Sequence, residues 1–169
     1  MSQSNVTIGL TNPKSPTNVG AVFRAAGCFQ ANSILYTGDR YDRGAAHCTD
    51  TQNLSKSIPL TRVECLVESA PEHAKIVVIE FAENAISLAD FKHPENAFYV
   101  FGPEDGSVKQ KVVNKADSVV YIPTIGSLNL AATVNVVLYD RLAKSTRSLE
   151  SNELIRASRD VNNRLKVKR

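Results

Sequence analysis

The sequence lacks the features that mark several common classes of protein. No apolar run approaches the length that a membrane span needs, and the first ten residues have neither the basic start nor the apolar core of a secretory signal. We therefore expect a cytoplasmic protein without a membrane partner. The chain also contains no GxGxxG fingerprint and no GK[ST] phosphate loop, which argues against a dinucleotide dehydrogenase and against a P-loop enzyme.

Cysteine and histidine are too few and too scattered to indicate a metal site. The chain has three of each: Cys28, Cys48, Cys65, His47, His73 and His93. The cysteines are odd in number and contain no CxxC pair, so we expect reduced structural thiols rather than disulfides or zinc ligands. The histidines show no metal-ligand spacing, and we expect ordinary surface or loop residues. No metal is predicted.

Positive charge gathers at the C-terminal end of the chain. The formal net charge is +3, yet residues 141–169 hold nine Lys or Arg against three acidic residues. A basic end on a slightly acidic body favours a polyanion such as RNA as partner, although a merely solvated tail would have the same composition. We divide the chain into a domain over residues 1–150 and a basic tail or helix over residues 151–169.

Short apolar runs alternate with segments of helical spacing along the chain. Strands are predicted at Val6–Leu10, Asn32–Tyr36, Lys56–Glu64, Lys75–Phe81, Ala97–Phe101 and from Val119 onward, with helices after Asn18 and near Asn129. At 169 residues the chain suits one domain. Apolar strands alternating with helices predict an α/β fold, with a mainly parallel sheet flanked by helices. Such sheets bind ligands beyond the carboxyl ends of their strands.

Three segments that contain or follow predicted strands carry the most suggestive polar residues. They are Asn12–Ala26 (NPKSPTNVGAVFRAA), Phe98–Val108 (FYVFGPEDGSV) and Val119–Asp140 (VVYIPTIGSLNLAATVNVVLYD). In the third segment Ser127 and Asn129 stand where a helix should begin. Either side chain could cap the first amides of that helix, and those amides could equally receive a ligand carboxylate. The residues alone leave both readings open.

Taken together, these segments resemble the TrmH-like (SpoU) branch of the SPOUT RNA methyltransferases. Asn18, Gly20 and Arg24 match the N-x-G-x-x-x-R pattern of that family. Phe101–Gly106 is similar to F-G-x-E-x-x-G, with the last glycine one place early, and Ile122–Asn129 is similar to I-P-x-x-G…S-L-N, with a shorter loop before the serine. In size the chain is similar to the small members that modify the tRNA wobble position.

The resemblance implies transfer of a methyl group from S-adenosyl-L-methionine to a ribose 2′-hydroxyl of RNA, with tRNA favoured over rRNA. It implies catalytic roles for four residues: Arg24, Asn18, Ser127 and Asn129. It implies that the cofactor is held by Glu80, Gly102, Glu104, Ile122, Ser127 and Leu128. It further implies a deep trefoil knot in the C-terminal third and a homodimer formed through the knot region.

Arg24 could serve this reaction in two ways. Accounts of the family propose arginine as the base that takes the hydroxyl proton. A guanidinium holds its own proton tightly, however, and forks onto phosphate, so we favour stabilisation of developing negative charge and clamping of phosphate. Two other functions fit the same residues: a non-catalytic RNA-binding module that retains the methyltransferase fold, and a small-molecule enzyme that uses the same cleft.

Overall fold

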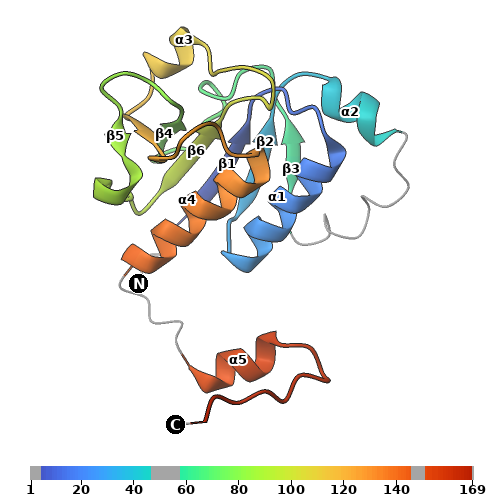
Figure 1. The fold of residues 1–169 in the computed structure, drawn as a ribbon. Helices are drawn as coiled ribbons and strands as arrows, with labels where there is room; N and C mark the ends of the chain where they lie inside the picture. Colours follow the sequence, from blue (N-terminus) through green and yellow to red (C-terminus); the bar gives the residue numbers. More distant parts are fainter. Residues whose placement is uncertain (1–4, 47–57, 146–150, 169) are drawn as a thin grey trace.

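The computed structural model describes residues 5–46, 58–145 and 151–168. Within these residues seven strands form one sheet in the order β3-β2-β1-β6-β4-β7-β5, and every neighbouring pair is parallel (Figure 1). The strands are β1 (Val6–Leu10), β2 (Ser33–Tyr36), β3 (Leu60–Arg62), β4 (Lys75–Ile79), β5 (Ile86–Ser87), β6 (Ala97–Phe101) and β7 (Ser118–Tyr121). The predicted α/β fold with a parallel sheet is confirmed.

Two long helices, α1 (Pro16–Cys28) and α4 (Leu130–Lys144), lie side by side across one face of the sheet (Figure 1). The shorter helical elements are α2 (Arg40–Ala45), the 3-10 turn η1 (Leu88–Asp90), α3 (Gln110–Val113) and α5 (Asn152–Ser158). Within the described residues, the predicted strand at Lys56–Glu64 is limited to β3, which begins directly after Pro59, because proline cannot donate to a strand ladder.

The core lies on both faces of the sheet, because the central strands are buried throughout. In β6 the alternating residues Tyr99 and Phe101 belong to the cluster covered by α1 and α4, whereas Phe98 and Val100 belong to the cluster on the other face. In α4 Val134, Val137 and Leu138 are buried at helical spacing. Because both faces of the central strands are buried, their residues are apolar without alternation, as the sequence shows.

Helix α1 begins earlier than the sequence predicted. We expected Asn18 to be its N-cap, but Ser15 is the cap, and the Ser15 hydroxyl accepts from the Asn18 backbone N–H at 3.2 Å. Pro16 explains the difference, since proline at the first helical position loses no hydrogen bond and has a backbone angle already set for a helix. Asn18 thereby becomes a first-turn residue whose side chain does not cap the helix.

The register of the sheet brings four strand ends to one edge. Phe101 at the end of β6 pairs with Leu10 at the end of β1 on one side and with Ile79 at the end of β4 on the other. Ile79 in turn pairs with Val120 of β7. The segments that follow these strands therefore start from neighbouring points.

One histidine differs from the prediction. We expected surface or loop histidines, and His73 is indeed exposed, but the side chain of His93 is only 5% exposed. Its two ring nitrogens lie 2.6 Å from the Tyr99 hydroxyl and 2.8 Å from an Asp140 carboxylate oxygen. His93 lies in the loop between η1 and β6, as one of the two predicted alternatives has it, but its side chain is buried there by contacts with distant segments, such as Asp140, which lies 47 residues away in the sequence. His47 and Cys48 lie outside the described residues.

The basic segment after the domain contains α5, with Ser151 as its N-cap. All residues of α5 (Asn152–Ser158) are exposed, including the apolar Leu154 and Ile155. In the described part of the chain no helix has the length and apolar character needed to cross a membrane.

Candidate active site

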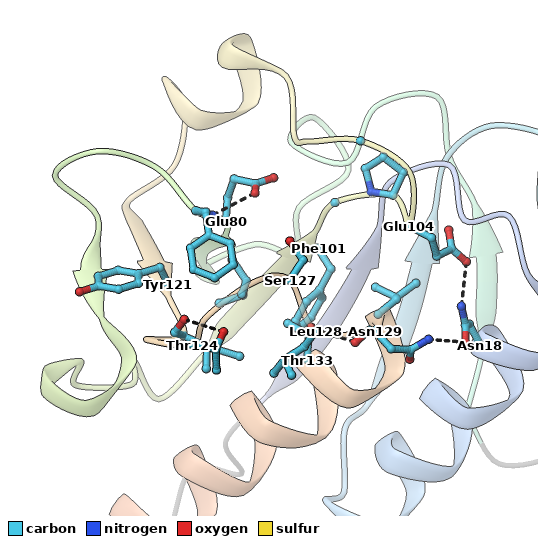
Figure 2. A pocket seen from close by; sticks show the side chains of 17 residues that line it. Asn18, Glu80, Phe101, Glu104, Tyr121, Thr124, Ser127, Leu128, Asn129 and Thr133 are labelled. Atoms are coloured by element: carbon cyan, nitrogen blue, oxygen red, sulfur yellow. Dashed lines mark hydrogen bonds between the residues drawn. The ribbon is translucent and has the colours of Figure 1, made fainter.

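A pocket opens at the carboxyl edge of the sheet, where β4, β6 and β7 end and α4 begins (Figure 2). Nine residues were predicted for the site, and eight of them line this pocket: Asn18, Glu80, Gly102, Glu104, Ile122, Ser127, Leu128 and Asn129. Arg24 is the exception. The structure therefore brings the predicted segments to one place, whereas the roles assigned to each residue stay predictions.

Three side chains link the three predicted segments in a hydrogen-bonded row (Figure 2). The Asn129 amide nitrogen donates to the Asn18 amide oxygen at 3.1 Å, and the Asn18 amide nitrogen donates to a Glu104 carboxylate oxygen at 3.3 Å. Because a carboxylate can only accept, the direction of both bonds is fixed. We call Asn129, Asn18 and Glu104 the amide relay.

Each end of the amide relay is anchored in the backbone. The Asn129 oxygen accepts from the Ala131 backbone N–H at 2.9 Å and so caps α4. Glu104 accepts from the backbone N–H groups of Lys14 and Ser15 at 2.9 and 3.0 Å. The cap reading thus holds for Asn129, and its amide nitrogen still remains available to reach Asn18.

The hydrogen bonds of Glu104 also set its charge. Burial alone would raise the pKa of Glu104, but the backbone N–H groups of Ser15 and Lys14, with help from Asn18, outweigh burial and lower the pKa below its ordinary value. Glu104 is therefore ionised at neutral pH. The relay ends on a fixed negative charge.

A second carboxylate, Glu80, holds the loop after β6 from the other side. Its two oxygens accept from the backbone N–H groups of Phe81 and Val108, each at 2.9 Å. At Gly102 a Cβ atom would lie 3.2 Å from a Glu80 oxygen, closer than most Cβ contacts. A side chain at Gly102 would therefore press on Glu80 as well as on the pocket.

The charge of the pocket has one sign. Among the described residues, its lining contains the carboxylates of Glu80 and Glu104 and no Lys, Arg or His. The rest of the lining is apolar, as at Ile79 and Leu130, or neutral and polar, as at Thr133. Such a lining suits a ligand that carries positive charge and disfavours a bare phosphate group.

The loop between β7 and α4 closes the pocket with a compact turn. The Thr124 hydroxyl donates to the Gly126 carbonyl at 3.0 Å, and Gly126 has a φ of +83°, in the region that glycine adopts without strain. Ile125 at the tip of the turn is fully exposed. The turn leaves Ser127 and Leu128 facing the pocket.

Arg24 lies elsewhere on α1. It is exposed, does not line the pocket and makes no hydrogen bond or ion pair within the part of the chain that the structure describes. Six residues separate it from Asn18, which is about 9 Å along a helix axis. Arg24 therefore does not join the other eight predicted residues in this pocket, and its catalytic role stays a prediction.

Sequence reasoning missed several lining residues, notably Phe81, Tyr121 and Thr133. Phe81 is the second residue after β4 and Tyr121 ends β7, so the rule that ligands bind beyond strand ends could have found both. Thr133 lies one helical turn after Asn129, and its hydroxyl donates to the Asn129 carbonyl at 3.0 Å. Its spacing from the predicted cap was the only available signal.

Solved structures share this fold. AviRb, a SpoU methyltransferase from Streptomyces viridochromogenes solved with AdoMet, is 23% identical, with a TM-score of 0.69 over 85% of this chain and 58% of AviRb. The TrmH/SpoU tRNA modifying enzyme of A. aeolicus is 20% identical, with a TM-score of 0.70 over 92% of this chain and 85% of that one. A protein studied for 2-OH methylation of C/U34 on tRNA is 21% identical, with a TM-score of 0.70 over 85% and 92%.

These identities are low, so the likeness demonstrates the fold, and this chain spans less than two thirds of AviRb. No curated protein sequence matches the chain. Residues 5–139 match the sequence model of the SpoU rRNA methylase family, which is most of the chain and includes the first two predicted segments and all but the last residue of the third. The chain therefore belongs to the SpoU rRNA methylase family.

Proposed function

We propose that this protein transfers a methyl group from S-adenosyl-L-methionine to a ribose 2′-hydroxyl of RNA, with tRNA as the substrate. The observation that carries the proposal is the amide relay, because it joins the three family segments at one pocket through two side-chain hydrogen bonds. A non-catalytic module would use the pocket only to bind RNA. The acidic lining of the pocket, however, disfavours binding of RNA phosphates.

The pocket suits S-adenosyl-L-methionine in its charge and shape. The cofactor is cationic at sulfur and at its amino group, and the pocket presents Glu80 and Glu104 without a competing cation. The glycine at position 102 leaves backbone accessible beside Glu80. Ile122 and Leu128 supply apolar surface for the adenosine part.

When bound, the cofactor supplies an activated methyl group on a positively charged sulfur. The chain's own residues then have three tasks. The amide relay fixes the loop after β6 against the starts of α1 and α4, so that the reacting groups meet in one geometry. Ser127 offers a hydroxyl at the pocket wall. Arg24 stabilises negative charge at the ribose oxygen or clamps an adjacent phosphate.

A homodimer would let Arg24 reach a pocket. Helix α4 packs beside α1 and exposes Val136 and Tyr139. Helix α1 exposes Ala21, Arg24 and Cys28. Exposed apolar side chains next to small ones favour close packing of a second copy. In this arrangement Arg24 of one subunit approaches the pocket of the other. We also expect the loop and helix after β7 to thread the trefoil knot.

RNA binding would use the basic segment at the C-terminal end. The described part of that segment carries Arg156, Arg159, Arg164, Lys166 and Lys168. These basic residues lie outside the acidic pocket. The RNA phosphates would therefore bind to one part of the surface and the cofactor to another. In the cell we expect the protein in the cytoplasm, together with tRNA.

The decisive experiment is a methyl-transfer assay with purified protein, radiolabelled S-adenosyl-L-methionine, and tRNA from cells that lack the protein. We expect label to enter tRNA as a 2′-O-methyl nucleoside, identified by nuclease digestion and mass spectrometry. Ribosomal RNA from the same cells is the control substrate. Binding of the cofactor and of tRNA without label transfer would favour the non-catalytic module instead.

A further inference from the structure

Two aromatic side chains stand together at one end of the pocket. Phe81 and Tyr121 both line it, with ring centroids 6.4 Å apart and ring planes tilted by 44°. Figure 2 shows Tyr121 at the end of the pocket opposite Asn18 and the amide relay. The pocket is therefore aromatic at one end and hydrogen-bonding at the other.

The sheet fixes the place of these rings. The Glu80 backbone N–H donates to the Val120 carbonyl at 3.0 Å and thereby joins the ends of β4 and β7. The Glu80 carboxylate then accepts from the Phe81 backbone N–H at 2.9 Å. Tyr121 is thus the last residue of β7, and Phe81 directly follows the hydrogen-bonded Glu80. The two rings form a preformed surface.

The rings are not covered by the rest of the chain. Phe81 is 50% exposed although it lies in a pocket, and Tyr121 is partly exposed. Because the planes are tilted rather than stacked, neither ring hides a face of the other. Open aromatic faces favour binding of a flat, unsaturated group. A nucleobase is such a group, because every base has a π face that can stack on an aromatic ring.

We infer that Phe81 and Tyr121 form a platform on which a nucleobase stacks. The inference rests on the proposed function, which supplies two sources of such a base: the adenine of S-adenosyl-L-methionine and an unpaired base of the RNA. The acidic residues of the pocket, Glu80 and Glu104, favour the cofactor, because its adenosine carries no phosphate.

Isothermal titration calorimetry with S-adenosyl-L-methionine alone tests the platform without measuring turnover. Phe81→Ala should weaken cofactor binding about tenfold, as expected for the loss of one stacked base. Phe81→Trp should restore binding, whereas Phe81→Leu, which keeps apolar surface without a π face, should not. The matched control is Ile86→Ala, since Ile86 is 43% exposed and does not line the pocket. Circular dichroism checks that each variant folds.

A second titration, with a single-stranded oligoribonucleotide and cofactor present, identifies the source of the base. If Phe81→Ala weakens RNA binding alone, the platform holds a base of the RNA. If Phe81→Ala binds both ligands as the wild type does, the platform is refuted while the proposed function stands. If the wild-type protein binds neither ligand, the proposed function fails and the platform fails with it.

Discussion

At the scale of single residues, Asn18 shows how position decides function. Its neighbours Val19 and Val22 are buried in the core, yet Asn18 points out of the same helix toward Glu104 and Asn129. Both polar ends of its amide are used, and no other short side chain offers a donor and an acceptor in this way. The sequence motif alone indicated the residue, whereas its two partners became visible only in the fold.

Arg24 provides a sharp test of the catalytic proposal. Replacing Arg24 with Ala should abolish methyl transfer, because the charge at the ribose oxygen loses its only proposed cationic partner. The free energy of unfolding should change by no more than about 0.5 kcal/mol, since the side chain is exposed and unbonded in the described structure. The measurements are the tRNA methylation rate, the cofactor Kd and urea denaturation. Full activity in the variant would remove Arg24 from the mechanism.

Glu104 predicts a dependence of stability on pH. Its pKa is lowered in the folded state by the backbone N–H groups of Ser15 and Lys14, which outweigh burial. The resulting stabilisation is fully present above the ordinary glutamate pKa of about 4.3 and is lost as the pH falls through the lower folded-state pKa. The melting temperature of Glu104→Gln should therefore lie below that of the wild type at pH 6, and the gap should narrow toward pH 3.

Glu83→Gln serves as the control for this comparison, because Glu83 is exposed and does not line the pocket. Its melting curve should follow the wild type at every pH. A gap between Glu104→Gln and the wild type that stays constant from pH 6 to pH 3 would contradict the role given to the Glu104 carboxylate.

At the scale of elements, helix α4 is held at both ends. Asn129 caps its start, and at its end Arg141 donates to the carbonyls of Pro94 and Glu95, each at 2.6 Å. His93 also contacts Asp140 of the helix. Burial lowers the pKa of His93 despite the nearby Asp140, so the neutral ring donates from Nε2 to Asp140 and accepts from the Tyr99 hydroxyl at Nδ1.

The loss of His93 should therefore loosen α4. His93→Ala removes two hydrogen bonds from a buried site and should lower the free energy of unfolding by about 1–3 kcal/mol. His73→Ala, at a side chain that is 80% exposed, should change it by less than about 0.5 kcal/mol. Urea denaturation of both variants gives the comparison. Equal stability of the two would show that the His93 contacts contribute little.

The elements also show where sequence reasoning succeeds and where it stops. Strands such as β1 and β6 could be predicted because they are short, apolar and bounded by turn residues. The site residues were predicted through the resemblance of three segments to the SpoU family, and eight of the nine line the pocket. The aromatic pair was missed because Phe81 and Tyr121 look like ordinary strand residues until the register places them side by side. The burial of His93 depended on contacts between distant segments.

At the scale of the whole molecule, the outer surface of α1 and α4 predicts the oligomeric state. Light scattering should give twice the chain mass of 18.4 kDa for the wild type. Tyr139→Glu places a charge on the exposed face of α4 and should yield monomers, with loss of methyl transfer but retained cofactor binding. Val161→Glu, at an exposed residue of the tail, is the control and should remain dimeric. A wild-type monomer that methylates tRNA would contradict the shared-site arrangement.

The basic tail predicts how RNA binding depends on salt. Deleting residues 151–169 should weaken tRNA binding and flatten the slope of log Kd against log salt concentration, because fewer phosphates are neutralised. Cofactor affinity and melting temperature should not change, since α5 contributes no buried residue. Filter binding at several salt concentrations measures the slope. An unchanged slope would assign RNA binding to the domain over residues 1–150.

The hydrogen bond between Asn18 and Asn129 spans 111 positions of the chain. Strand β1 pairs with β2, which is near in the sequence, and also with β6, which is far from it. No fragment emerging early from the ribosome can therefore assemble the pocket. Synthesis must pass the start of α4 before the pocket can form, and a premature stop codon anywhere before α4 would give a product without a complete pocket.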